Sequence, residues 1–272
     1  MSGKNHSMGG YPMSDDSIQG RFLWYDLMTT DTEAAQKFYP KVTAWGIEIW
    51  SGAGSPYPMW KAGETPIGGA GVLPEEARSK GMPPYWLAHV GTSNVDAACR
   101  QVEELQGRVL KQPEDIPTVG RFAVIADPHG AVLSLFQPEA APPGHQGDLV
   151  PGQVSWHELL AGNLDEAWTF YQALFGWAKM DVVDMGEMGP YQMFGVAGRM
   201  LGGIFTKPDT IPGPPNWLYY VLVSDLGRAL EAVRAGGGQV MNGPMEVPGG
   251  DHVAQCLDPQ GAAFALHEKK AR

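Results

Sequence analysis

The stretch FLWYDLMTTDTEAAQKFYPKVTAW, residues 22–45, returns later in the chain as VSWHELLAGNLDEAWTFYQALFGW, residues 154–177. The two segments align without a gap, so that an early Trp, a Phe-Tyr pair and a final Trp each recur 132 positions later. Similarity at a fixed separation indicates that one structural unit has been duplicated. The segment therefore predicts a chain built from two homologous halves.

The rest of each half supports the duplication. YPMW matches YQMF, PIGGAG matches MLGGIF, YWLAHVGTSN matches NWLYYVLVSD, and DPHGAVLSL matches DPQGAAFAL. Residues 139–152 are rich in Pro and Gly and lack apolar periodicity, which is typical of an exposed linker. We therefore assign one domain to residues 21–138 and one to residues 153–270. Residues 1–20, rich in Gly, Ser and Asp, are expected to form a disordered leader.

A finer rhythm runs through each half. Twice in each half, an apolar stretch of strand length leads into a short polar residue and then into apolar residues spaced three and four apart, followed by short strands broken by glycines. Short polar side chains at such positions can accept hydrogen bonds from the unpaired amides of a first helical turn. The four predicted capping residues are Asp31, Asn94, Asn163 and Asp225. The pattern predicts four βαβββ modules.

The order of these features resembles a known family. A strand, a capping Asp or Asn, a helix ending in FY, a Trp soon after it and a late DPxG strand occur in both halves. In this order they resemble paired modules of the vicinal oxygen chelate superfamily, the glyoxalase and bleomycin-resistance group. The resemblance covers almost all of the chain after residue 20. It implies an α+β fold in which the four modules form two domains with curved, half-closed mixed sheets.

Composition limits the classes of partner. The 272 residues carry a formal net charge of -11, and no basic stripe is present to attract a phosphate backbone. No run approaches the roughly 20 apolar residues that cross a bilayer, and no signal-peptide pattern begins the chain. Nucleic acid and membrane partners are therefore disfavoured, and cytoplasmic residence is the default expectation. Cys99 and Cys256 stand alone and are expected to be buried as small apolar residues.

The resemblance also implies where a metal would bind. Enzymes of the superfamily hold a divalent metal with His, Glu or Gln on the inner strands, and such a site needs at least three converging ligands. The corresponding first-strand positions fall on Trp24, Leu87, Trp156 and Leu218. The last-strand positions fall on Ser134 and Ala265, and the remaining positions fall near Gly69 and Gly203. Because indole, alkyl and glycine positions cannot coordinate a metal, we expect no metal and no other cofactor unless a strand register is misassigned.

Strand alternation predicts which side chains line the cavities instead, because residues two apart share one face of a strand. If Trp24 and Trp156 point inward, each is followed on the same face by an acid, Asp26 or Glu158. The other predicted cavity residues are His89, Tyr220, Phe136 and His267.

Other aromatic positions are assigned mainly to the core. Tyr25 and His157 should point to the opposite face of their strands and pack under a helix. A central strand of each half carries matched aromatic residues, for which core packing is the favoured interpretation and a pocket wall the second. Trp60 and Phe194 are the candidates for that wall. DPHG and DPQG are interpreted as turns before the final strands rather than as catalytic segments.

Two pairings of the modules are open, because the superfamily pairs them within a domain or across domains. Cross-pairing would unite the predicted cavity residues of different domains: Trp24 and Asp26 with Tyr220 and His267, and Trp156 and Glu158 with His89 and Phe136. A carboxylate near an imidazole suits acid–base chemistry or capture of a cation. Aromatic walls favour the second, since indole faces attract cations.

Three hypotheses of function follow. The first is a metal-independent protein that binds a small aromatic or cationic organic molecule for sequestration, resistance or regulation. The second is a glyoxalase-like lyase or hydroxylase-type oxidoreductase acting on a small oxygenated metabolite, with Asp26, Glu158 or His89 as catalytic base and with or without a divalent metal. The third is a protein that acts only through an interaction partner. The duplication predicts a monomer with an internal pseudo-dimer, or a homodimer.

Overall fold

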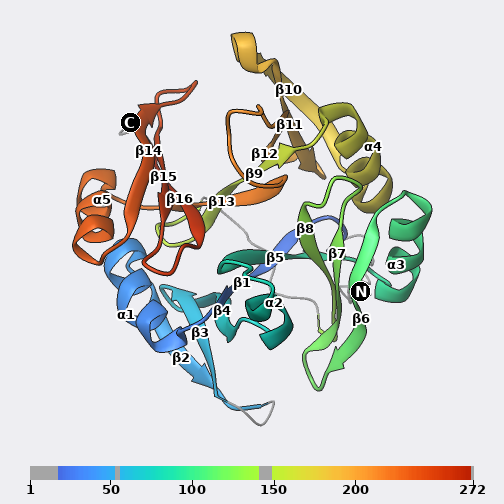
Figure 1. The fold of residues 1–272 in the computed structure, drawn as a ribbon, viewed down its shortest axis with the longest axis horizontal. Helices are drawn as coiled ribbons and strands as arrows, with labels where there is room; N and C mark the ends of the chain where they lie inside the picture. The colour runs from blue at the N-terminus through green and yellow to red at the C-terminus, as the bar shows by residue number, and fades with distance from the viewer. Residues whose placement is uncertain (1–17, 53–55, 141–148, 271–272) are drawn as a thin grey trace, which may run out of the picture.

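A computed structural model describes residues 18–52, 56–140 and 149–270 (Figure 1). Most of the predicted leader, residues 1–20, and most of the predicted linker, residues 139–152, lie outside these ranges. The expectations of disorder and exposure for these two segments therefore stay predictions.

The first domain is one eight-stranded sheet with helices. Its strands are β1 (Phe22–Thr29), β2 (Gly46–Trp50), β3 (Tyr57–Ala62), β4 (Thr65–Val72), β5 (Tyr85–Gly91), β6 (Arg108–Ile116), β7 (Gly120–Ala126) and β8 (Val132–Pro138). Its helices are α1 (Thr32–Thr43), α2 (Glu75–Ser79) and α3 (Val95–Glu104). The strand order is β2-β3-β4-β1-β5-β8-β7-β6, so the two modules meet where β1 pairs with β5.

The second domain repeats this plan. Its strands are β9 (Val154–Ala161), β10 (Ala178–Asp184), β11 (Pro190–Val196), β12 (Arg199–Thr206), β13 (Asn216–Leu222), β14 (Gln239–Glu246), β15 (His252–Leu257) and β16 (Ala263–Glu268). Its helices are α4 (Leu164–Phe175), α5 (Leu226–Ala235) and the short 3₁₀ helix η2 (Gly186–Met188). The order β10-β11-β12-β9-β13-β16-β15-β14 mixes parallel and antiparallel pairs, as in the first domain. The predicted α+β fold of four modules in two domains with mixed sheets is confirmed, and neither sheet is closed.

The four long helices begin where the capping pattern predicts. Asp31 accepts a hydrogen bond from the amide of Ala34, and Asn94 from the amide of Ala97. Asn163 and Asp225 cap α4 and α5 in the same way. Each of these helices buries the apolar stripe that the three-and-four spacing predicts.

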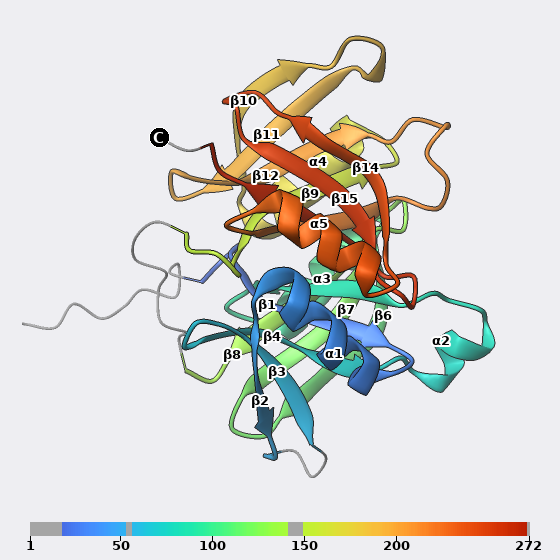
Figure 2. The same cartoon turned by 90° about the vertical axis from the view of Figure 1, so that its left-hand side faces the viewer.

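The two sheets pack back to back, and each curves away from the other domain (Figure 1). Helix α1 lies against α5 and helix α3 against α4, so that helices of different domains pair at both sides of the contact (Figures 1 and 2). We call the face of each sheet that looks toward the other domain its inner face, and the opposite, concave face its outer face. Short helix α2 projects from one end of the first domain (Figure 2).

Equivalent residues meet at the centre of this contact. Tyr25 Oη lies 2.6 Å from His157 Nε2, and the two residues are separated by the repeat length of 132. Burial lowers the pKa of His157 to about 3, so the ring is neutral, Nδ1 donates to the Leu201 carbonyl, and Nε2 accepts from Tyr25. The opposite-face prediction for both residues is confirmed, but the expected helix above them is wrong. Their ring neighbours are Phe22 and Tyr219, on strands of the two sheets, because the second sheet occupies that place.

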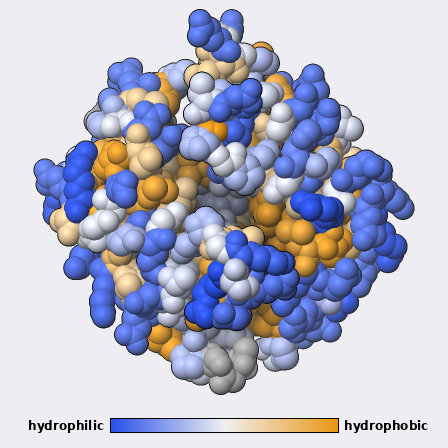
Figure 3. Space-filling model, in the orientation of Figure 1, coloured by the Kyte–Doolittle hydropathy of each residue, from blue (hydrophilic) through white to orange (hydrophobic). Residues whose placement is uncertain are grey.

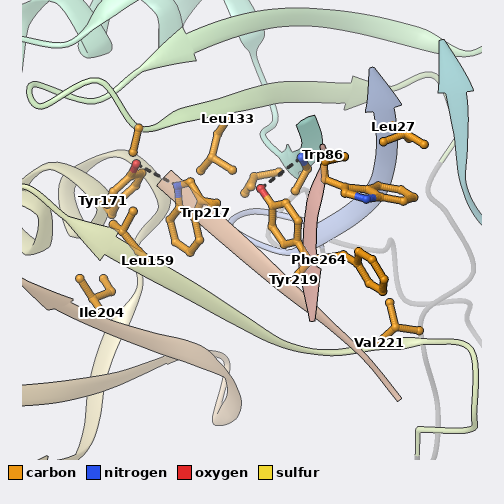
Figure 4. Packing of buried hydrophobic residues seen from close by; sticks show 14 of the residues in the cluster. Leu27, Trp86, Leu133, Leu159, Tyr171, Ile204, Trp217, Tyr219, Val221 and Phe264 are labelled. Atoms are coloured by element: carbon orange, nitrogen blue, oxygen red, sulfur yellow. Dashed lines mark hydrogen bonds between the residues drawn. The ribbon is translucent and has the colours of Figure 1, made fainter. Parts of the chain in front are cut away.

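The DPHG and DPQG segments form the predicted turns and also bridge the domains. Asp127 accepts hydrogen bonds from the amides of His129 and Ala131, and its second oxygen accepts one from Tyr171 Oη at 3.2 Å. Asp258 accepts from Tyr39 Oη at 3.0 Å in the equivalent contact. Figure 4 shows the hydrogen bond from Trp217 to Tyr171 within the apolar packing between the sheets. The inter-domain role of these aspartates was not predicted from the sequence.

The inner faces and the helices form one large apolar core that includes residues of both domains. Cys99 and Cys256 are free and buried in it, as predicted. At the surface, hydrophobic residues lie in patches between hydrophilic ones (Figure 3). Among the described residues, no helix is long and apolar enough to cross a bilayer.

Candidate functional site

Strand alternation divides β1 between the two faces of the first sheet. Leu27 is fully buried in the core and Tyr25 contacts the second domain, whereas Trp24 and Asp26 lie on the outer face. In the antiparallel register, Trp24 pairs with His89 of β5. The outer face thus receives the residues that alternation from Trp24 predicts.

Asp26 is the centre of a hydrogen-bonded group on this face, which we call the Asp26 cluster: Trp24, Asp26, Tyr57 and His89. Asp26 Oδ1 accepts hydrogen bonds from Trp24 Nε1 at 3.1 Å and from the Tyr57 hydroxyl. Asp26 Oδ2 lies 2.9 Å from His89 Nε2. Trp24 Nε1 also lies 2.9 Å from Tyr57 Oη. Both carboxyl oxygens are therefore held by side chains from β1, β3 and β5.

These contacts keep Asp26 ionised. Burial by itself would raise the pKa of the carboxyl, but the hydrogen bond and positive charge of His89, with the hydrogen bonds of Tyr57 and Trp24, lower that pKa below its usual 3.8. A carboxylate can only accept hydrogen bonds, so His89 Nε2 is the donor of this pair. The side chain of Asp26 keeps 19% of its surface exposed.

Aromatic side chains surround the imidazole. The ring centroids of Phe136 and Phe122 lie 5.9 Å and 6.2 Å from that of His89. Tyr85 lies two residues before Leu87 and four before His89 on β5, on the same face. The first domain thus combines one charged carboxylate, one imidazole and partly exposed aromatic rings.

The second domain has a different group at the equivalent place, which we call the Glu158 cluster: Trp156, Glu158, Tyr191, Tyr220 and Gln255. Glu158 Oε1 accepts a hydrogen bond from Tyr191 Oη at 3.1 Å. Its Oε2 accepts from Tyr220 Oη at 2.9 Å and from Gln255 Nε2 at 3.4 Å. Trp156 Nε1 donates to Tyr191 Oη at 2.7 Å.

This cluster is covered by apolar packing. Leu218, Tyr220, Val253 and Ala265 form a separate buried group with Trp156 packed against it. Burial raises the pKa of the Glu158 carboxyl above 4.5, and the bonds from the two tyrosines only partly counter this. Burial therefore shifts the pKa of this acid upward, whereas that of Asp26 is shifted downward.

Tyr57 and Tyr191 were not among the predicted site residues. Each lies over a glycine of the next strand, and a Cβ atom at Gly69 or Gly203 would overlap the ring of Tyr57 or Tyr191, respectively. The matched YPMW and YQMF segments are a sequence signal for these tyrosines. Their contact with the acids depends on how β3 and β11 pair with β4 and β12, which no local pattern reveals.

Three predicted cavity residues lie elsewhere. Trp60 and Phe194 are fully buried on the inner faces, since alternation turns them away from Tyr57 and Tyr191, and Trp60 Nε1 donates to the Gly69 carbonyl at 2.7 Å. They pack in the core, so the pocket-wall placement is not seen. His267 contacts Ser155 Oγ at 2.8 Å and Asp251 Oδ2 at 2.9 Å rather than Glu158, because it lies one step further along the sheet, opposite Leu222.

The sheets also decide which modules share a cavity. Asp26 meets His89, and Glu158 meets Tyr220, all within single domains. Cross-pairing would have joined Asp26 with Tyr220 and Glu158 with His89. It does not occur, because β1 pairs with β5 and β9 pairs with β13, each within its own domain.

Two open, duplicated sheets with these modules define a glyoxalase-type fold, and the comparisons agree. The model of the Glyoxalase/Bleomycin resistance protein/Dioxygenase superfamily matches residues 21–135 and again residues 153–266. The chain belongs to this superfamily.

Curated relatives span nearly the whole chain. "Putative glyoxylase CFP32" of Mycobacterium tuberculosis is 32% identical over 261 residues, which cover 94% of this chain and 97% of the relative. "Anthracycline biosynthesis protein DnrV" of Streptomyces peucetius is 30% identical over 269 residues, which cover 92% and 93%.

Solved structures show the same fold at low identity. A Mn(II)-bound glyoxalase from Novosphingobium aromaticivorans aligns with a TM-score of 0.60 at 19% identity, covering 93% of this chain and 82% of that one. The 2,3-dioxygenase LapB from Pseudomonas sp. KL28 aligns with a TM-score of 0.62 at 12% identity, covering 93% and 94%. At these identities the likeness concerns the fold alone.

The side chains that the structure describes do not form a site for a divalent metal. Three converging ligands are needed, and residues 18–52, 56–140 and 149–270 hold no group of three or more His, Cys, Asp or Glu placed to bind one. Of the positions where the family would supply ligands, Ser134 is fully buried and its hydroxyl donates to a backbone carbonyl, and Gly69 lies under Tyr57.

Proposed function

We propose that this chain is a metal-independent binding protein for a small organic molecule, which it holds on the outer face of the first domain. The observation that carries the proposal is the Asp26 cluster, where an ionised, partly exposed carboxylate stands among aromatic rings. Sequestration, resistance or regulation are the roles that such binding serves.

The chemistry of the face favours a ligand with an aromatic body and a positive charge. The carboxylate of Asp26 attracts a cation, and the Trp24 indole beside it offers a ring face for a cation or a planar ring. The Glu158 cluster lacks this combination, since burial raises the pKa of its acid and apolar side chains cover it. We therefore propose one ligand per chain, in the first domain.

Two relatives carry names that refer to anthracycline biosynthesis. Anthracyclines combine fused aromatic rings with an amino sugar that is cationic at neutral pH, which matches the features of this face. Daunorubicin is therefore the first probe, with its uncharged aglycone as a matched neutral ligand.

The test is calorimetric titration of the full chain in the presence of EDTA. We expect a stoichiometry near one, and we expect Asp26→Asn to weaken daunorubicin binding about tenfold, roughly the worth of one charge-assisted contact. Binding of the aglycone should change much less. Glu158→Gln is the control and should leave both affinities unchanged.

Equal losses in Asp26→Asn and Glu158→Gln would contradict the placement of the site in the first domain. Failure of daunorubicin, its aglycone and a wider panel of cationic and neutral aromatic compounds to bind would overturn the proposed function. Affinity that disappears with EDTA and returns with a divalent metal would overturn its metal independence.

A further inference from the structure

Three polar side chains of the second domain converge beside the Glu158 cluster but are not part of it. Ser155 Oγ lies 2.8 Å from His267 Nδ1, and His267 Nε2 lies 2.9 Å from Asp251 Oδ2. The residues come from β9, from β16 and from the segment between β14 and β15. We call them the Ser155 triad. A hydroxyl, an imidazole and a carboxylate in this order form the arrangement that activates a serine as a nucleophile.

A β-bulge places Ser155 against the imidazole. Val154 and Trp156 pair with consecutive residues of β13, so Ser155 is the extra residue of β9 at this point. Such a bulge changes the direction of a side chain relative to the regular alternation of the strand. The Ser155 hydroxyl therefore reaches across β13 to His267 on β16, and it also lies 3.1 Å from the Tyr220 carbonyl oxygen.

The carboxylate holds the imidazole in one orientation. Asp251 Oδ1 accepts a hydrogen bond from the Lys270 amide at 2.9 Å, which fixes the acid itself. Burial by itself would raise the pKa of Asp251, but the bonds from the Lys270 amide and His267 lower that pKa below its usual 3.8. Because a carboxylate only accepts hydrogen bonds, His267 Nε2 carries the proton of the neutral ring. The lone pair of Nδ1 then faces the Ser155 hydroxyl.

The first domain provides an internal comparison. It has the same bulge, between Phe22 and Trp24 of β1. The repeat and the strand registers place Leu23, Gly120 and Phe136 at the positions equivalent to Ser155, Asp251 and His267. None of the first three side chains can act as nucleophile, acid or base. The two domains thus differ together at three positions that are distant in the sequence and meet in space, which indicates a site specific to the second domain.

The triad is open to a substrate on one side. Ser155 is partly exposed, and the side chains of His267 and Asp251 keep 13% and 33% of their surface exposed. His267 pairs with Val253, which belongs to the apolar group against which Trp156 packs. An apolar surface beside the nucleophile suits an uncharged substrate with an apolar group.

We propose that the Ser155 triad is an acyl-transfer site that hydrolyses uncharged carboxylic esters with a short apolar acyl group. Ser155 Oγ attacks the carbonyl carbon, its proton passes to His267 Nδ1, and the carbonyl π pair moves to the oxygen. That pair returns as the bond to the leaving oxygen breaks, and the leaving oxygen takes the proton from Nδ1. Water then attacks the acyl group on Ser155, and its proton passes through Nδ1 to Ser155 Oγ as the carboxylic acid leaves. Water is the one co-reactant, and no oxidant or reductant is needed.

In this scheme Ser155 and His267 are the catalytic residues, and Asp251 is a positioning residue that acts through the imidazole. The activity goes beyond the binding proposed for the first domain and does not depend on it, because the two sites share no residue.

The test is hydrolysis of 4-nitrophenyl butyrate by the full chain, followed by the absorbance of the released nitrophenolate. We expect Ser155→Ala and His267→Ala each to lower kcat/KM about a hundredfold, the usual worth of a positioned base and its nucleophile. Asp251→Asn should lower kcat about tenfold at little change in KM, the worth of one charge-assisted hydrogen bond. Asp251→Glu keeps the charge and should recover part of this loss.

Two variants control for reaction at other side chains. His252→Ala removes a neighbouring imidazole that lies outside the triad, and it should hydrolyse the ester at the wild-type rate. Ser79→Ala removes an exposed serine of α2 and should also react at the wild-type rate.

A covalent label tests the nucleophile without any substitution in it. A fluorophosphonate bonds to an activated serine with loss of fluoride, and peptide mass spectrometry locates the label. We expect it on Ser155 of the wild-type chain, and we expect His267→Ala to be labelled about a hundredfold more slowly although its serine is intact. Circular dichroism and a thermal melt establish that each variant is folded.

Wild-type hydrolysis no faster than that of Ser155→Ala would overturn the proposal, as would a label on any residue other than Ser155. Equal labelling rates for wild type and His267→Ala would overturn the role of His267 as the base. None of these outcomes changes the expected binding of daunorubicin in the first domain, so the two proposals fail separately.

Discussion

The outer faces of the two domains share an architecture, but the pKa of the central acid is shifted in opposite directions. Each places a Trp and an acid two residues apart on its first strand, under a Tyr that lies over a glycine. In the first domain the acid faces an imidazole and its pKa is lowered, whereas in the second it faces two phenols under apolar cover and its pKa is raised.

The difference arises at few positions. His89 in the first domain corresponds to Tyr220 in the second. Each pairs with a Trp on the neighbouring strand, His89 with Trp24 and Tyr220 with Trp156. A partner that can carry positive charge lowers the pKa of a carboxyl, and a neutral hydroxyl cannot offset burial to the same extent. The exchange of His for Tyr at this position therefore contributes to the opposite pKa shifts of the two acids.

The largest expected difference between the faces concerns the glycines beneath the tyrosines. In Gly203→Ala the new methyl group overlaps Tyr191, whose ring stacks on Phe205 at 5.8 Å, so we expect a loss of about 3 kcal/mol of unfolding free energy. In Gly69→Ala the Tyr57 ring can move toward the more open outer face, and the expected loss is about 1 kcal/mol. Urea unfolding measures both.

The control for these glycine variants is Gly227→Ala in α5. A Cβ atom there has an ordinary contact of 3.4 Å with Asp225 Oδ1, and alanine favours helix, so stability should not fall. Equal losses for Gly69→Ala and Gly203→Ala would show that the two faces are equally closed, against the comparison.

A smaller difference is expected for the tyrosine hydroxyls. Tyr57→Phe leaves Trp24 Nε1 bonded to Asp26, so we expect a loss of about 1 kcal/mol. Tyr191→Phe removes the hydroxyl that accepts from Trp156 Nε1 and donates to buried Glu158. We therefore expect a loss of about 2 kcal/mol of unfolding free energy. Thermal and urea unfolding measure which variant loses more stability. A larger loss for Tyr57→Phe than for Tyr191→Phe would contradict the expected order.

The smallest expected effect is that the stability contributions of Glu158 and Asp26 change with pH in opposite directions. The pKa of Glu158 is raised in the folded chain, so the stability of wild type relative to Glu158→Gln should be greatest below pH 4.5 and fall as the pH rises through the folded value. The pKa of Asp26 is lowered, so the stability relative to Asp26→Asn should be greatest above pH 3.8 and fall as the pH drops through the folded value.

Unfolding free energies of the three proteins between pH 3 and pH 8 test this contrast. If the two differences, wild type minus Glu158→Gln and wild type minus Asp26→Asn, changed with pH in the same direction, the opposite pKa shifts of the two acids would be contradicted.

Much of the fold was predicted from local patterns. The capping residues Asp31 and Asn94 satisfy amides only a few positions away, so their role is visible in a short window of sequence. Trp24 and Asp26 were placed on one face for a similar reason, since alternation along a single strand needs no knowledge of its neighbours. The acid and the His of the first site were therefore predicted as cavity residues, although their pairing was not.

Contacts between strands were harder to predict from the sequence. Trp60 was selected as a wall residue in place of Tyr57, because the choice between the two faces of β3 depends on the pairing of Met59 with Gly69 and of Gly69 with Asp26. Alternation predicted His267 as a cavity residue, which cross-pairing would have placed with Asp26. The structure instead pairs it with Leu222 and bonds it to Ser155 and Asp251.

The sequence by itself determined that this protein is a duplicated, four-module chain with an acid and a tryptophan on the first strand of each half, because repeats, caps and alternation are properties of neighbouring residues. Only the tertiary structure decided that each acid is served within its own domain, that a tyrosine covers the glycine beside it, and that Tyr25 and His157 meet between the sheets. Those contacts join residues far apart in the chain, and their energies depend on burial and on the charge of partners that meet only when the sheets have formed.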